Sequence, residues 1–351
     1  MSTPESSPRD FGAFEWCPTR GDRAEFSRAL TAGAEGPHPL AVSRGMKRRL
    51  GILLAIPVAV VFVLTVARPV AALLRGEHDP ALTLIQAGFF LTIVLGLTLV
   101  LLLLNRNTRR ALTVALQLRR FARDNDLGTA PASLNPRLPG MPFTEGTGVV
   151  ASDRLLAGRG QRYFELANLR FTTGTGRSAR IHHWAFLAVR LSAHLPHIVL
   201  DARANNRLGT TLPLSLARDQ ILSLEGDFDR HFTLYCPRAY ERDALQLLTP
   251  DLMALLIDHA APFDVEIIDD YLFVYATRPL DAHILERLLD VGDTVAVPAA
   301  AQGAHYRDER STVPAAGLVD LPGRRLRVAR TWSLIAMLIV AAVLVTLMLL
   351  T

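Results

Sequence analysis

Three long apolar runs divide the chain. Residues 81–104 and 331–350 carry no charge, and residues 50–74 are interrupted only by Arg68-Pro69. A bilayer core of about 30 Å requires about 20 apolar residues in helical form. The pattern therefore predicts three transmembrane helices, at 50–74, 81–104 and 331–350. A cleaved signal peptide is the alternative for the first run, but the long stretch before it does not fit the short charged region of a signal peptide.

The period of the pattern becomes helical and amphipathic after the second run. Apolar residues recur there near helical spacing: Leu112, Ala115, Leu116, Leu118 and Phe121. We therefore expect the second span to continue as an amphipathic cytoplasmic helix over 105–126. Four prolines between 131 and 142 then predict an extended loop.

The region 127–300 changes from helical to strand-like periodicity. Segments 162–174 and 179–192 flank a Gly-rich turn and predict a hairpin, and 197–203 and 230–236 predict two more strands. Short helices are predicted over 240–248, over 250–261 with Thr249 as N-cap, and over 281–291. The segments FDVEII and YLFVYAT flank Asp269-Asp270 as a tight hairpin. The fold class predicted for this cytoplasmic domain is α+β with a mainly antiparallel sheet, followed by a linker over 301–330.

The first 49 residues are rich in Ser, Pro, Gly and Arg. This composition predicts a mostly disordered cytoplasmic tail. One short helix is expected within it, from Asp22 to Ala32, ended by Gly33.

The composition indicates a cellular compartment but predicts no particular chemistry. The 38 basic residues include a single lysine, Lys47, which indicates codon bias in a GC-rich bacterial genome more than a functional demand. The arginines gather beside the apolar runs and do not form a stripe with interleaved aromatics, so we expect no nucleic-acid partner despite the net charge of +5. Two cysteines are too few for a disulfide framework and fit a reducing compartment.

The positions of the arginines predict the topology. Basic residues precede the first and third runs and follow the second, whereas the short link between the first two runs is balanced in charge. The positive-inside rule then places the N-terminus and the large domain in the cytoplasm and the C-terminus outside, in a multi-pass plasma-membrane protein whose partner is the lipid bilayer. The predicted membrane-surface contacts are Arg48, Arg49, Arg106, Arg109, Arg110, Arg324, Arg325 and Arg327.

Several strings resemble those of one family. They include FARDNDLG at 121–128, NPRLPGMPF at 135–143, EGDFDRHFTLYCP at 225–237 and FDVEIIDDYLFVY at 263–275. They are similar to uncharacterised actinobacterial multi-pass membrane proteins that carry a domain of unknown function, over about two thirds of the chain. The resemblance implies the same architecture and brings no activity, cofactor or catalytic residue with it.

The remaining site signals favour structural roles. Neighbouring histidines on a strand point to opposite faces, so neither His182-His183 nor His194 with His197 predicts a metal site, and surface or turn histidines are expected. Cys236 is expected to be a small buried residue and Cys17 a free thiol in the tail.

Acidic residues form the other candidate cluster. Glu225, Asp227 and Asp229 would share one face of an extended segment, and Asp264, Glu266, Asp269 and Asp270 recur in the later predicted hairpin. Such rows can bind hard cations, but Arg230 lies beside the first row, so Asp227 and Asp229 are expected to cap or turn the entry to the strand at 230–236.

The sequence thus predicts no catalytic residue, cofactor or metal site. A membrane-anchored binding or scaffold protein with a protein partner is the first hypothesis. A membrane-bound hydrolytic or metal-dependent enzyme is the alternative, and transport ranks last because the spans offer no polar pathway. Convergence of carboxylates and histidines in one concave pocket would favour the enzyme.

Overall fold

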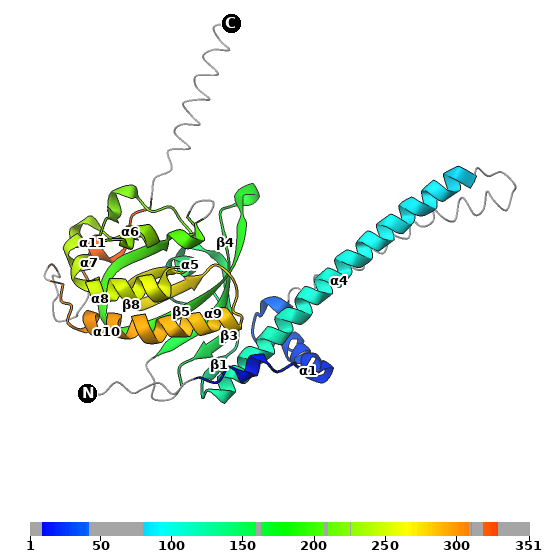
Figure 1. Ribbon diagram of the computed structural model, residues 1–351, viewed down its shortest axis with the longest axis horizontal. Coiled ribbons are helices and arrows are strands. Elements are labelled where there is room, and N and C mark those ends of the chain that lie inside the picture. Colours follow the sequence, from blue (N-terminus) through cyan, green and yellow to red (C-terminus); the bar gives the residue numbers. More distant parts are fainter. Residues whose placement is uncertain are drawn as a thin grey trace, which may run out of the picture. The chain divides into compact units, whose positions relative to one another are not determined.

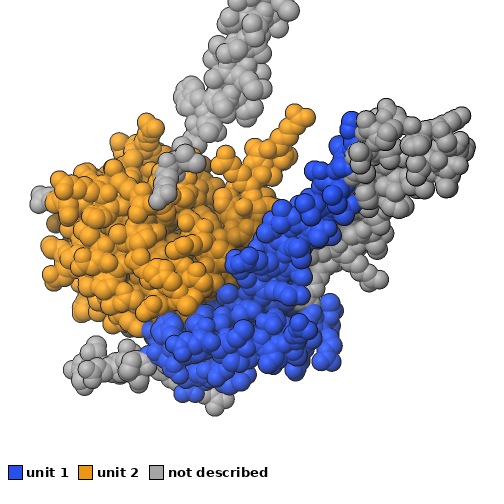
Figure 2. Space-filling view, turned by 45° about the vertical axis from the view of Figure 1, so that its right-hand side comes forward, with its two compact units in different colours: residues 1–134, 150–158 blue, residues 135–149, 159–351 orange. Residues whose placement is uncertain are grey.

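The computed structural model describes residues 9–41, 80–158, 163–206, 210–224, 226–308, 310 and 319–328. The predicted spans at 50–74 and 331–350, and with them Arg48 and Arg49, lie outside the described residues. The chain forms two compact units, coloured separately in Figure 2. The first comprises residues 1–134 and 150–158, and the second comprises residues 135–149 and 159–351.

One helix dominates the first unit. Helix α4, Pro80–Asp124, runs for 45 residues without interruption (Figure 1). It contains both the second predicted span and the predicted amphipathic helix, so the expectation that one continues into the other is confirmed. Over Leu91–Asp124, α4 is long and apolar enough to cross a membrane, and it is the one such helix among the described residues.

The N-terminal segment packs on the amphipathic end of α4. Helix α1, Arg20–Thr31, begins with a capping box between Thr19 and Asp22. Its Phe26 and Leu30 are buried with Leu112 and Ala115 of α4, and the rings of Phe11 and Phe14 lie 5.0 and 6.0 Å from that of Phe121. The predicted short helix is therefore confirmed. The prediction of a disordered tail is wrong for residues 9–41, because aromatic and aliphatic side chains bind this segment to α4.

One short strand, β2, Ser133–Leu134, lies where the extended loop was predicted, between two strands that flank it. Strand β3, Thr147–Leu156, begins in the second unit and continues from Val150 in the first. In the first unit it pairs antiparallel with β1, Gly128–Ala130, and β2, Ser133–Leu134. The predicted boundary of a domain at 127 therefore differs from the division of the structure, which assigns 127–134 to the unit of α4.

The second unit is built on an antiparallel sheet around β5, Arg180–Ala202. Strand β4, Phe164–Thr173, pairs with the first half of β5 in the predicted hairpin, from Phe164 opposite Val189 to Thr173 opposite Arg180. Strand β7, Phe232–Tyr235, pairs with the end of β5 and with β6, Ile221–Leu222. Strand β8, Asp264–Ala276, pairs with the edge of β5 opposite to β4 and β7, and nearly the whole of β8 takes part.

Short helices complete the second unit. They are α5 Met141–Glu145, α6 Phe228–His231, α7 Glu241–Leu247, α8 Pro250–Leu255, α9 Ala282–Val291, α10 Val297–Ala304 and α11 Leu321–Arg324. Helix α9 continues through a π-helical turn at Gly292–Ala296 into α10, which packs on β5 so closely that a Cβ at Gly303 would lie 3.1 Å from Leu195. The N-cap predicted at Thr249 is confirmed, since its hydroxyl accepts from Leu252 N.

These elements confirm the α+β class and the mainly antiparallel sheet, with three differences in detail. Segments 179–192 and 197–203 form one strand, β5, where two were expected. Asp269-Asp270 lies inside β8 and not in a hairpin turn, with Asp269 at a φ of 52°. The linker expected over 301–330 begins within α10 and contains α11.

Candidate functional site

The exposed part of α4 changes from apolar to cationic within two turns. Leu91, Leu95, Leu99 and Leu102 are between 57 and 67% exposed. They are followed by Arg106, Arg109 and Arg110, which we call the collar. These arginines are exposed, and none has a carboxylate partner among the described residues. Such a sequence of surfaces is what a helix presents when it leaves the hydrocarbon core and meets lipid headgroups.

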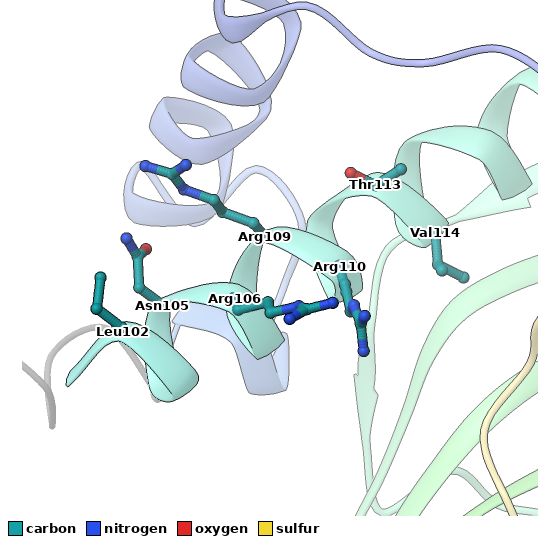
Figure 3. A pocket seen from close by; sticks show the side chains of 7 residues that line it. All are labelled: Leu102, Asn105, Arg106, Arg109, Arg110, Thr113 and Val114. Carbon is teal, nitrogen blue, oxygen red and sulfur yellow. The ribbon is translucent and has the colours of Figure 1, made fainter. Parts of the chain in front are cut away.

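The collar arginines lie on two sides of the helix. Figure 3 shows Arg106 and Arg110 extending from one side of the helix and Arg109 from another. The three arginines and Leu102 line an open pocket of about 580 Å³. Arg106 and Arg110 are four residues apart, where like charges repel and destabilise a helix by about 0.2–0.5 kcal/mol. An external anion would relieve this repulsion, so the collar is suited to an anionic surface.

Arginines further along α4 are used within the first unit. The guanidinium of Arg119 pairs with Glu35 and lies 4.5 Å from the centre of the Phe26 ring. That of Arg120 lies 5.1 Å from the Trp16 ring and 3.5 Å from Asp124. Arg119 and Arg120 are therefore engaged within the first unit, unlike Arg106, Arg109 and Arg110 of the collar.

The other predicted arginines belong to a segment of the second unit, residues 319–328, which we call the strap. Arg325 donates to both oxygens of Asp269 at 3.0 and 3.1 Å, and Arg327 pairs with Asp219. Arg324 is half-buried, and its Nε donates to the carbonyl of Val319 at 2.6 Å. Carboxylates of the second unit thus neutralise Arg325 and Arg327, whereas the described contacts of Arg324 engage its Nε alone.

Hydrogen bonds to the backbone also fix the strap in the second unit. Arg327 N donates to Gln220 Oε1 and Gln220 Nε2 donates back to the Arg327 carbonyl, both at 2.8 Å. Val328 forms a bridge with Leu216, and the N–H of the buried Leu326 donates to His197 Nδ1 at 3.0 Å. The strap therefore reaches the interior of the second unit.

His197 connects the strap to a buried carboxylate. Because Nδ1 accepts from Leu326, the proton of the neutral ring lies on Nε2, which donates to Glu266 Oε1 at 2.8 Å. Glu266 is fully buried and also accepts from Met141 N and, at 2.7 Å, from the Tyr275 hydroxyl. The burial of Tyr275 and the charge of Glu266 raise the pKa of that phenol. Every oxygen of this carboxylate has a donor, as a buried charge requires.

The prediction of surface or turn histidines was wrong for His197, which is 4% exposed. His183 is exposed as expected, and His182 stacks on Phe171 at 4.6 Å. A weak signal for the burial of His197 was its position within an apolar string, which the structure buries on both faces.

A second buried carboxylate, Asp264, closes the loop after β5. It accepts from Ala202 N at 2.8 Å, from Asn205 Nδ2 at 3.0 Å and from the Thr211 hydroxyl at 2.9 Å. Burial raises the pKa of Asp264 to about 6, against these hydrogen bonds, which lower it. Asp264 and Glu266, two members of the predicted acidic cluster, are therefore interior structural groups.

A turn separates the side chains of the earlier acidic cluster, so they do not share one face of an extended segment. Asp227 precedes α6, but its side chain caps no backbone N–H. Asp229 instead accepts from Leu224 N at 3.2 Å and from the Ser223 hydroxyl. The predicted turn role is confirmed for Asp227, whose carbonyl accepts from Arg230 N at 2.9 Å, and for Asp229, whereas the Asp227 side chain makes no capping bond. Glu225 lies outside the described residues.

The cysteines take the predicted environments. Cys236 is fully buried, and burial raises the pKa of its thiol to about 12, whereas Cys17 is exposed. Across the described ranges, no group of three or more His, Cys, Asp and Glu side chains is arranged to hold a metal ion.

Comparison with known proteins adds one match. No family model and no curated protein matches the chain. Among solved structures, the chain is similar to the crystal structure of the mycobacterial trehalose monomycolate transport factor A, TtfA, at 13% sequence identity and a TM-score of 0.35, over 53% of this chain and 93% of that chain. At this level of similarity the match assigns no function.

Proposed function

We propose that this protein is a multi-pass membrane protein that acts by binding and not by catalysis, with its second unit held in the cytoplasm as the binding or scaffold domain. The observation that carries the proposal is the continuity of α4, from exposed leucines through the exposed collar to the end that packs on α1.

The leucines of α4 make a water-exposed state unfavourable. Burial of apolar surface stabilises by about 25 cal/mol per Å², and contiguous apolar patches on soluble proteins are small. A bilayer covers the row from Leu91 to Leu102 and places the collar at its boundary. In the proposed topology this boundary faces the cytoplasm, and 50–74 and 331–350 form the other two spans.

The carboxylates of the later acidic cluster, on which the enzyme alternative partly relied, are engaged by protein partners. Glu266 and Asp264 are buried and satisfied. Asp269 accepts from Arg325, and Asp270 accepts from Arg190 at 2.8 Å. These contacts favour a scaffold whose polar groups maintain its shape, and they support binding over hydrolysis.

Reporter fusions test this topology. A reporter active only in the cytoplasm is inserted at the N-terminus, at Thr175 in the exposed turn between β4 and β5, and after Thr351. Activity is expected at the first two positions and none at the third. Activity after Thr351, or its absence at Thr175 in a chain that accumulates normally, would overturn the proposed topology.

A further inference from the structure

Strands β5 and β8 shift register twice between Arg190 and Ile198. Arg190 lies opposite Tyr271, but the next pairs are Leu195 with Asp269 and Ile198 with Ile267. Five residues of β5 thus span the distance of two in β8, and Asp269 adopts the left-handed conformation. Non-glycine residues in the left-handed conformation cost free energy and persist only where the surrounding fold holds them. Such residues, like bulges, are more frequent at functional sites.

A groove of about 620 Å³ opens at this bulge. Its charged lining comes from separate segments of the second unit: Arg137, His194 on the bulge, Asp269 and Asp270 of β8, and Arg324 and Arg325 of the strap. The groove therefore forms only when the strap is in place.

The charges of the groove do not cancel. The Asp269 carboxylate takes two donors from Arg325, and Asp270 takes one from Arg190. Arg137 is exposed, and neither Arg137 nor His194 has a side-chain partner among the described residues. The Nε bond of Arg324 to the Val319 carbonyl orients its guanidinium and leaves the two terminal nitrogens available. Two arginines and a histidine thus remain for an anion.

The described part of the strap ends at Val328, three positions before the start of the predicted third span. Val328 is fixed by its bridge to Leu216, and the apolar run begins at residue 331. Three residues reach at most about 10 Å. The strap also carries exposed apolar side chains beside its arginines, since Leu321 is 75% and Val328 53% exposed. Cationic and exposed apolar side chains together are typical of segments at a membrane interface.

We infer that this groove binds the phosphate of an anionic phospholipid headgroup at the cytoplasmic surface. The inference rests on the proposed function, because the lipid is within reach only if 331–350 enters the bilayer. Arg137 and Arg324 would bind the phosphate oxygens, and His194 would add a hydrogen bond. Arginine suits this task because its planar group presents paired donors to phosphate oxygens.

The test is a titration of the full chain in neutral detergent with dihexanoyl phosphatidylglycerol, dihexanoyl phosphatidylcholine and inorganic phosphate, followed by calorimetry. We expect phosphatidylglycerol to bind more tightly than the other two. Arg137→Gln and Arg324→Gln should each raise its Kd about fivefold, the effect of about 1 kcal/mol per basic residue near anionic lipid. Arg177→Gln, which removes an exposed arginine of the same unit outside the groove, should change the Kd less than twofold.

Equal binding of both lipids, or unchanged phosphatidylglycerol binding in Arg137→Gln, would overturn the inference. Arg137 is exposed and has no side-chain partner among the described residues, so its replacement should leave the fold intact and this variant decides even if Arg324→Gln fails to fold. Inorganic phosphate binding as tightly as the lipid would show a site for free phosphate and overturn the lipid assignment. Carbonate extraction of membranes from the expressing cells separates the two proposals. A chain that is extracted contradicts the proposed function. A chain that stays in the membrane but shows no lipid preference in the titration contradicts only the proposed lipid site in the groove.

Discussion

The collar of α4 and the strap of the second unit look alike in sequence and differ in structure. Each is a cluster of arginines beside an apolar run. The collar arginines have no carboxylate partner among the described residues, whereas the strap pairs Arg325 with Asp269 and Arg327 with Asp219. The strap also hydrogen-bonds to His197 and Gln220. Proximity to a predicted span thus does not reveal whether an arginine serves the lipid or the protein.

The largest effect should come from removing the interior anchor of the strap. His197→Leu leaves the buried Glu266 without one donor and Leu326 N without its acceptor. Loss of one partner from a buried pair costs about 3 kcal/mol. Urea unfolding followed by the fluorescence of Trp184, with Trp16 and Trp332 replaced by phenylalanine, measures this loss. His183→Leu changes an exposed histidine of the same strand and should shift the unfolding free energy by less than about 0.5 kcal/mol. Equal stabilities of the two variants would refute the anchoring role.

The next difference concerns pH, which should affect the second unit through Asp264 and leave the arginines of the collar charged. The folded pKa of Asp264 is about 6, above its ordinary value of 3.8, so the folded state binds the proton more tightly. The contribution of Asp264 to stability is therefore present below pH 3.8 and is lost as the pH rises to about 6. The stability of the natural protein relative to Asp264→Asn should fall across this window, measured by thermal unfolding. A constant difference would contradict the raised pKa.

A smaller effect distinguishes two neighbouring aspartates before β7. Asp229→Ala removes the acceptor of Leu224 N and of the Ser223 hydroxyl and should lower the unfolding free energy by about 1 kcal/mol. Asp227→Ala removes an exposed carboxylate without a capping bond and should lower it by less than about 0.5 kcal/mol. The reverse order in urea unfolding would show that Asp227 is the residue that holds the turn.

The smallest effect contrasts the two arginine groups directly. Arg325→Gln breaks a half-exposed ion pair and should destabilise the second unit by about 0.5 kcal/mol, less at high salt. Arg106→Gln breaks no such pair among the described contacts and relieves repulsion with Arg110. Its unfolding free energy should therefore stay equal or rise slightly. Equal destabilisation by both substitutions would remove the distinction between collar and strap.

Local signals in the sequence predicted the elements that local chemistry determines. The Gly-rich turn defined the hairpin of β4 and β5, Thr249-Pro250 defined the start of α8, and the apolar spacing from Leu112 to Phe121 defined the end of α4. In each case the decisive residues lie within a few positions of one another.

Features set by distant contacts escaped prediction. Asp269-Asp270 is typical of a turn, yet the pairing of β8 with β5 holds it inside a strand, opposite a bulge of β5. His197 became an interior residue because Glu266 and Leu326 bond to it from far along the chain. The order of residues 9–41 likewise depends on α4 as a surface for Phe26 and Leu30.

The groove could not be predicted for the same reason. Arg137, His194, Asp269 and Arg324 are separated by long stretches of sequence and meet only through the bulge and the strap. Sequence reasoning identified Arg324 and Arg325 as surface cations, but it did not reveal that Arg325 would neutralise Asp269.

Cysteine accessibility along α4 tests the central claim most directly. The experiment starts from Cys17→Ser, in which the remaining Cys236 is buried. One cysteine at a time then replaces Leu95, Leu99 or Asn107, whose side chains no other described part of the protein buries. A membrane-impermeant maleimide is applied to intact cells and to opened membranes. We predict that Asn107→Cys is labelled only after opening and that Leu95→Cys and Leu99→Cys stay protected in both preparations and react in detergent. Labelling of Leu95→Cys or Leu99→Cys in opened membranes at the rate of Asn107→Cys would show that lipid does not cover this part of α4, and would contradict the account.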